Sequence, residues 1–119
     1  MEFQFKKDYP DVEKRKNQCK ILLIKEPTKI PVILEKDPNS KLEAINKTKH
    51  LILKKLTVNK FQLMIKNLLK MPEEDALFLS IRGKYTIIGE KTMADIYAKY
   101  KDKEDGFLYI MYSSEVIYG

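Results

Sequence analysis

The chain of 119 residues is poor in the side chains that carry most enzyme chemistry. It has one cysteine, one histidine and no tryptophan, and its four glycines are too scattered to form a phosphate-binding loop. One cysteine excludes an intramolecular disulfide framework, and no His, Cys, Asp or Glu spacing is typical of a metal site. A reactive pair of Cys19 with His50 is conceivable, but a buried structural cysteine and an edge-strand histidine are the favoured interpretation. We therefore predict a non-enzymatic protein without a metal or cofactor.

Long hydrophobic runs are also missing. No stretch is long enough to cross a bilayer, and the chain opens without an apolar signal segment, so we expect a cytoplasmic protein whose membrane attachment, if any, is acquired. The formal net charge of +6 favours acidic partners. Only Arg15 and Arg82 are arginines, and most aromatic residues fall at predicted core positions, so we predict no nucleic-acid partner.

Two helices are predicted before Pro27. A short one carries Phe3 and Phe5, and after the break at Tyr9-Pro10 a longer one runs from about Asp11 to Lys25. The longer segment is amphipathic, and it should lie on an apolar surface. Its apolar side is predicted to hold Val12, Cys19, Leu22 and Leu23, and its solvent side Glu13, Lys14, Arg15, Lys16 and Lys20.

The rest of the chain alternates strands and helices. β-branched runs and turn residues predict strands at Ile30–Glu35, His50–Leu53, Ala76–Ile81, Lys84–Ile88 and Phe107–Tyr112. Thr57 is the expected N-cap of one helix, which ends before Pro72, and Thr92 that of another, with Asp95 three residues on. The buried face of the first helix is predicted to comprise Val58, Phe61, Met64 or Ile65, Leu68 and Leu69.

This succession predicts an α+β fold, a ubiquitin-like β-grasp with a two-helix N-terminal extension. We expect one domain overall, made of a helical extension over residues 1–26, a core over 27–113 and a flexible tail over 114–119. The tail ends on Gly119, which lacks a Cβ and can therefore thread a narrow channel to present its carboxyl group to another active site. A frayed end without function is the alternative.

The strand around residues 49–53 predicts a binding surface. Alternation places Lys49, Leu51 and Leu53 on one face and His50 and Ile52 on the other, so the core of the sheet cannot absorb both sets, and one apolar face needs a cover that the N-terminal helix could partly supply. If this strand is a sheet edge, its unpaired backbone groups can accept an extended peptide. Nearby lysines, at positions 25, 29, 47 and 49, would favour acidic residues beside the peptide's apolar anchors. A solvated lysine surface over a filled core is the alternative.

Several segments together carry a family resemblance. They are Lys29-Ile-Pro-Val-Ile, Lys47 to Leu51, Glu74-Asp-Ala-Leu-Phe78, Phe107-Leu-Tyr-Ile and Tyr118-Gly119. In this order they resemble the autophagy ubiquitin-like modifiers, the family of microtubule-associated light chain and GABA-receptor-associated protein. The resemblance runs from about residue 2 to the end. Departures include Leu23 and Ile24, which stand where members are commonly basic.

The resemblance implies a conjugation cycle. In the family, a C-terminal glycine is adenylated and passed through thioesters on ubiquitin-activating-like and ubiquitin-conjugating-like enzymes. It is then joined to the amine of phosphatidylethanolamine, and a cysteine protease reverses the conjugation. Gly119 would be that glycine, needing no prior trimming, and the conjugate would mark an autophagosome or related organelle membrane. Two acyl chains suffice for stable attachment.

The resemblance also implies two pockets for receptors and adaptors that carry aromatic-x-x-aliphatic motifs. The aromatic pocket would use Leu22, Pro31, Ile33, Lys49, Leu51 and Phe107. The aliphatic pocket would use Ile52, Leu53, Leu56, Phe61 and Met64. The rival interpretation is a cytosolic peptide-binding module that uses the same surface and is never conjugated.

Overall fold

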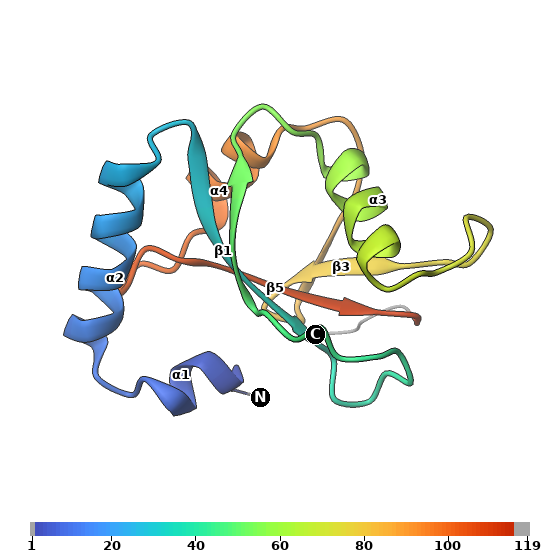
Figure 1. Ribbon diagram of the computed structural model, residues 1–119, viewed down its shortest axis with the longest axis horizontal. Coiled ribbons are helices and arrows are strands. Elements are labelled where there is room, and N and C mark those ends of the chain that lie inside the picture. Colours follow the sequence, from blue (N-terminus) through green and yellow to red (C-terminus); the bar gives the residue numbers. More distant parts are fainter. Residues whose placement is uncertain (1, 116–119) are drawn as a thin grey trace.

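A computed structural model describes residues 2–115, in which four helices surround one five-stranded sheet (Figure 1). The predicted α+β class is therefore confirmed. The helices are α1 (Gln4–Asp8), α2 (Val12–Lys25), α3 (Val58–Leu68) and α4 (Met93–Tyr100). The strands are β1 (Lys29–Lys36), β2 (Lys49–Leu53), β3 (Phe78–Ile81), β4 (Tyr85–Ile87) and β5 (Leu108–Ser113).

The sheet is mixed, with the strand order β2-β1-β5-β3-β4. β1 and β5 run parallel in the centre, and the pairs β1 with β2, β3 with β4 and β3 with β5 are antiparallel. Pro31 precedes the first residue of β1 that pairs with β5, Val32, so its missing N–H is not needed on that side. The sheet leaves β2 at one edge and β4 at the other.

Side-chain caps begin three of the helices. Thr57 Oγ1 accepts from the backbone N–H of Lys60 at 3.2 Å, and Thr92 Oγ1 accepts from that of Asp95 at 3.2 Å. Both caps were predicted from the sequence. Asp11 does the same for α2, where its Oδ1 accepts from the N–H of Glu13 at 2.9 Å. Each cap satisfies a donor that the first helical turn leaves unpaired.

Helices cover both faces of the sheet (Figure 1). One face packs against α3 and α4 and forms an aliphatic cluster, which includes Val32, Phe61 and Ile110, all fully buried. The other face packs against α1 and α2 and forms a smaller cluster that is mostly aromatic, comprising Phe3, Phe5, Cys19, Ile33, Phe107, Tyr109 and Met111. Successive residues of a strand point to opposite faces, so β1 and β5 contribute to both clusters.

Two predicted placements are wrong. Arg15, expected on the solvent side of α2, is only 4% exposed, because its guanidinium pairs with Asp105. Leu68, expected on the buried face of α3, is 51% exposed. At the end of α3 it is Leu69 and Met71, rather than Leu68, that pack against the core.

Of the tail predicted over residues 114–119, the structure describes Ser114 and Glu115, and Gly119 lies outside the described residues. Within residues 2–115 no helix is both long and apolar enough to pass through a bilayer.

Candidate peptide-binding surface

β2 forms one of the two edges of the sheet, which is the position that addition of a peptide strand requires. Its only neighbour within residues 2–115 is β1, so one row of its backbone groups faces away from the sheet. The register pairs Leu51 with Pro31 and Lys49 with Ile33, which places these four residues on the face covered by α2. Ile52 pairs with Ile30 on the opposite face. Both faces of β2 are thus apolar, and each lies beside a helix.

The residues predicted for the aromatic pocket divide into buried residues, here called the floor, and half-buried residues, here called the rim. Pro31, Ile33 and Phe107 are buried, and Ile33 and Phe107 belong to the aromatic cluster with Leu22 packed against it. Leu22, Lys49 and Leu51 are half-buried. Because Leu51 and Pro31 are cross-strand partners, the rim of β2 directly adjoins the floor of β1. These six residues come from α2, β1, β2 and the start of β5.

The residues predicted for the aliphatic pocket come from β2, from the turn that follows it and from α3. Ile52 and Phe61 are buried in the aliphatic cluster, and Leu56 and Met64 are half-buried and pack against that cluster. Leu53 is 43% exposed at the end of β2. By strand alternation Leu53 lies on the same face as Leu51, opposite to Ile52, and its exposed side chain offers apolar area that a ligand can cover.

Basic groups border this edge. Lys25 and Lys47 are exposed, and Lys29 and Lys49 are half-buried, with Lys49 Nζ donating to Gln18 Oε1 at 3.1 Å. The ring of His50 lies 2.6 Å from the carbonyl oxygen of Lys47. Burial lowers the pKa of His50, and the nearby Lys47 charge lowers it further, against the opposing effect of that backbone contact. The positive charge at this edge therefore comes from the lysines.

The structure does not bring Cys19 to His50. Cys19 lies in the aromatic cluster beside Tyr97 and Gly106, and a Cβ at Gly106 would fall 2.9 Å from its Sγ. Burial raises the pKa of the Cys19 thiol to about 11, so the thiol is protonated at neutral pH. The sequence interpretation of a buried structural cysteine agrees with this placement. No cluster of potential metal ligands occurs within residues 2–115.

Sequence reasoning missed the buried polar groups that hold α2 in place. Arg15 Nε donates to Asp105 Oδ2 at 2.8 Å, and the hydroxyl of Tyr109 donates to the same oxygen. Arg15 also donates to the carbonyl oxygen of Tyr9 at 2.7 Å. Its side chain is 5% exposed and that of Asp105 0%. The one available signal was compositional, since Arg15 is a rare arginine among lysines and arginine suits buried ion pairs better.

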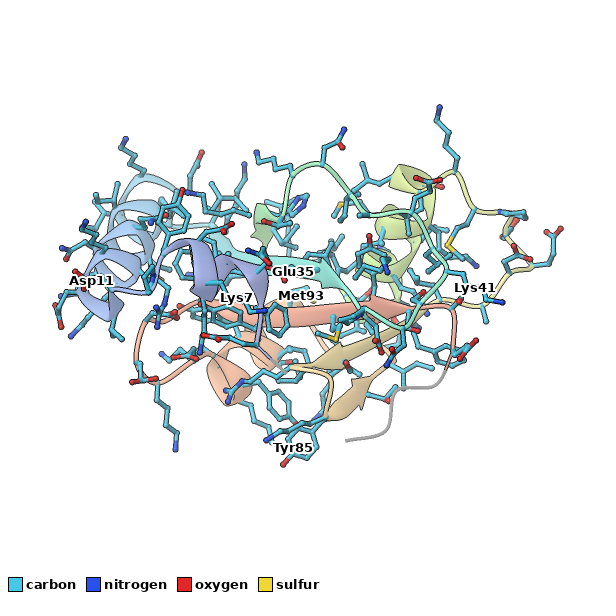
Figure 2. All side chains as sticks on the ribbon, turned by 90° about the horizontal axis from the view of Figure 1, so that it is seen from below. Lys7, Asp11, Glu35, Lys41, Tyr85 and Met93 are labelled. Carbon is cyan, nitrogen blue, oxygen red and sulfur yellow. The ribbon has the colours of Figure 1, made fainter. Side chains whose placement is uncertain are left out.

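Hydrogen bonds also fix α1 on the sheet. The backbone N–H groups of Gln4 and Phe5 donate to the Glu35 carboxylate at 2.7 and 2.9 Å. In Figure 2, Glu35 lies beneath α1 near the middle of the molecule. Lys6 Nζ donates to Asp102 Oδ2 at 2.9 Å. The two N-terminal helices are therefore integral to the packing around β2 and β5.

The sheet is mixed, carries α3 on one face, and pairs its first and last strands in parallel at its centre. This arrangement is the ubiquitin-like fold. The family described as "Autophagy protein Atg8 ubiquitin like" matches residues 14–119. The crystal structure of Trypanosoma brucei ATG8 is similar over 100% of both chains, with a TM-score of 0.89 and 32% sequence identity. The chain therefore belongs to the Atg8 family of ubiquitin-like autophagy proteins, as the sequence motifs indicated.

Proposed function

We propose that this protein is a non-enzymatic modifier that is joined through Gly119 to phosphatidylethanolamine and recruits motif-bearing receptors and adaptors to the marked membrane. Family membership supports the autophagy role, and the apolar residues on both faces of β2 support peptide binding. In its free form the protein is cytoplasmic; as the conjugate it is attached to an autophagosome or a related organelle. Its further partners are the activating-like and conjugating-like enzymes and a deconjugating cysteine protease.

The conjugation step requires an activated terminal carboxyl group. Adenylation activates the glycine carboxyl, a thioester on the conjugating-like enzyme holds it, and the amine of phosphatidylethanolamine displaces the thiol to form an amide. Intact mass spectrometry of membrane and soluble fractions from the protein's own cells tests this proposal. We expect a phosphatidylethanolamine adduct in the membrane fraction, and its loss in a variant that lacks Gly119. Unmodified protein in both fractions would instead support the unconjugated peptide-binding module.

The observation that carries the receptor-binding proposal is the open edge of β2. An extended peptide can add as a further strand there, since main-chain groups supply affinity and side-chain pockets supply specificity. An aromatic anchor would lie on the floor formed by Pro31, Ile33 and Phe107, and an aliphatic anchor between Leu53, Leu56 and Met64. Lysines at this edge would attract acidic residues that flank the anchors.

Truncation of one half-buried rim residue tests this placement. Leu51→Ala should weaken binding of an aromatic-x-x-aliphatic peptide by about tenfold, because it removes apolar area that the peptide would cover. Ile88→Ala is the matched control, since Ile88 is 76% exposed and follows β4 at the other edge of the sheet. Titration calorimetry and thermal unfolding measure affinity and stability together. Equal affinity of both variants, each with unchanged stability, would contradict the site.

A further inference from the structure

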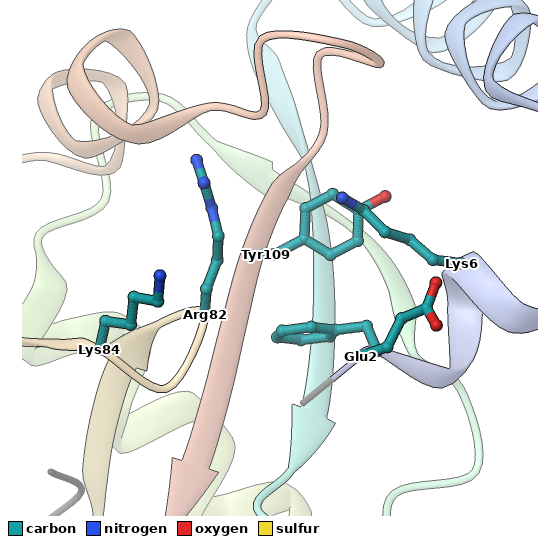
Figure 3. Close-up of a pocket in the computed structure, with 6 residues that line it drawn as sticks. Glu2, Lys6, Arg82, Lys84 and Tyr109 are labelled. Carbon is teal, nitrogen blue, oxygen red and sulfur yellow. The ribbon is translucent and has the colours of Figure 1, made fainter. Parts of the chain in front are cut away.

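A hollow of about 420 Å³ lies away from the β2 edge, between the N-terminal segment and the β3–β4 hairpin. It is lined by Glu2, Phe3, Lys6, Arg82, Lys84 and Tyr109. Figure 3 shows Arg82 and Lys84 approaching from one side of β5, and Glu2 and Lys6 from the other. Segments distant in the sequence therefore bring three cations and one carboxylate to the same hollow.

The floor of this hollow is formed by buried aromatic rings. Phe3 is 4% exposed and Tyr109 1%, and their rings meet edge to face with centroids 5.1 Å apart. Lys6 Nζ lies 4.8 Å from the centroid of the Tyr109 ring and pairs with Asp102. Lys6 is thus held in place by an aromatic ring and a carboxylate.

Within the described part of the chain, no carboxylate neutralises the two cations on the hairpin. Within residues 2–115, neither Arg82 nor Lys84 lies within 4.0 Å of a carboxylate oxygen. Arg82 donates one hydrogen bond, from Nη2 to the carbonyl oxygen of Tyr100 at 3.2 Å, so most of its donors stay available. An arginine anchored in this way presents its planar fork with less loss of side-chain entropy on binding.

The backbone at the hairpin tip is unusual for an arginine. Arg82 has φ 54° and Gly83 has φ 76°, and the N–H of Lys84 donates to the carbonyl of Ile81 at 2.8 Å, so the tip is a tight turn with two consecutive positive φ values. Asparagine and glycine favour the first of these positions, whereas a long side chain there is uncommon. The backbone N–H of Arg82 donates to the carbonyl oxygen of Tyr109 at 3.0 Å, which holds the tip against β5.

We propose that this hollow binds a phosphomonoester group carried on a compact polar molecule such as a phosphorylated inositol. A phosphomonoester carries about −1.5 to −2 charges at pH 7, which matches the two unpaired cations better than a monoanion does. Arginine binds phosphate oxygens through two parallel N–H groups, and lysine adds a point charge. The volume lies in the ordinary range of small-molecule sites, about 300–1,000 Å³, and exceeds what a bare phosphate needs.

The test compares two double variants of equal charge. Arg82→Asn with Lys84→Gln removes both unpaired cations, and asparagine tolerates the left-handed backbone at position 82. Lys41→Gln with Lys91→Gln removes two exposed lysines that do not line the hollow. The probes are soluble inositol 1,4,5-trisphosphate, measured by calorimetry, and phosphatidylcholine vesicles containing phosphatidylinositol 4-phosphate, measured by sedimentation. Vesicles with phosphatidylserine at the same surface charge are the lipid control.

We expect saturable binding of a phosphomonoester probe at one site, weakened about tenfold in the hairpin variant and little changed in the control. Glu2→Gln should tighten binding by about twofold, because Glu2 repels the anion. Binding of the soluble probe identifies a free ligand, and binding of the phosphoinositide vesicles alone identifies a lipid headgroup. No saturable binding, equal losses in both double variants, or equal binding to phosphatidylserine vesicles would overturn the proposal. None of these outcomes depends on conjugation or on the β2 edge.

Discussion

The two faces of the sheet are stabilised by different kinds of interaction. The face under α3 and α4 is an aliphatic cluster that includes Val32, Ile65 and Ile110, each fully buried. The face under α1 and α2 is a smaller aromatic cluster, completed by buried polar contacts between Arg15, Asp105 and Tyr109. Apolar burial is non-directional and tolerates small shifts, whereas a buried ion pair requires both partners in a fixed geometry.

This difference indicates which part of the molecule can unfold locally while the rest stays folded. The helices α1 and α2 are held by a limited number of specific contacts, through Glu35, Asp102 and Asp105, and the loss of one contact leaves a charged group unpaired. On the α3 side, many side chains contribute to the aliphatic cluster, and we expect disruption of this cluster to unfold the whole domain. The next three predictions test this contrast.

The largest effect is expected on the aliphatic side. Phe61→Ala removes a fully buried ring and leaves a cavity, which typically costs about 3–5 kcal/mol of stability. Because the aliphatic cluster includes residues of all five strands, we expect unfolding in urea to shift to lower concentration at probes in α2 as well as in α3. A shift at α3 without one at α2 would contradict the idea that this cluster supports the entire fold.

A smaller and more local effect is expected for Arg15→Ala. It leaves the Asp105 carboxylate buried without its cation, which costs about 3 kcal/mol. Hydrogen exchange should show a larger loss of protection in α2 than in α3. Lys14→Ala is the matched control, because Lys14 is exposed on the same helix. An equal loss in the two helices would show that the two faces unfold together.

The smallest effect is a pH dependence carried by Asp102. Burial alone raises the pKa of Asp102, but the hydrogen bond from Lys6 and the backbone N–H groups of Asp105 and Glu104 outweigh it, and the net pKa lies below the ordinary 3.8. The contribution of the Asp102 carboxylate to the free energy of unfolding is therefore complete above pH 3.8, and it is lost as the pH falls through the folded-state pKa. Urea titrations at several pH values should show that the free energy of unfolding falls less steeply with decreasing pH for Asp102→Asn than for the unmodified protein. Parallel curves would assign the acid sensitivity to other carboxylates.

Much of the architecture could be predicted because its signals are local. Thr57 and Thr92 each cap a helix by accepting a hydrogen bond from the backbone N–H three residues later. The alternation of side chains in residues 49–53 is likewise a property of one strand. The strand at Ala76–Ile81 was predicted two residues too long at its start, since β3 begins at Phe78. Such boundaries depend on which partner strand is present, and this information lies elsewhere in the chain.

The features that could not be predicted depend on distant residues. Helical periodicity assigns a charged residue such as Arg15 to solvent by default, and its partner Asp105 lies 90 residues further along the chain. Leu68 occurs at the spacing of the buried face of α3, but spacing alone does not show which residues at the end of a helix reach the core. The hollow around Arg82 and Tyr109 likewise exists only after β5 is placed beside β3. The peptide pockets stay a prediction, which rests on the family resemblance and on the position of β2.

The central position of β5 has a consequence for the order of events during protein synthesis. In the sheet described for residues 2–115, β5 lies between β1 and β3 and pairs with both, so it joins the β1–β2 pair of strands to the β3–β4 pair. A nascent chain that has not yet released residues 108–113 from the ribosome can form the two hairpins but cannot unite them. The complete sheet can therefore form only after β5 has been synthesised, and until then the strand edges of β1 and β3 that face β5 stay unpaired.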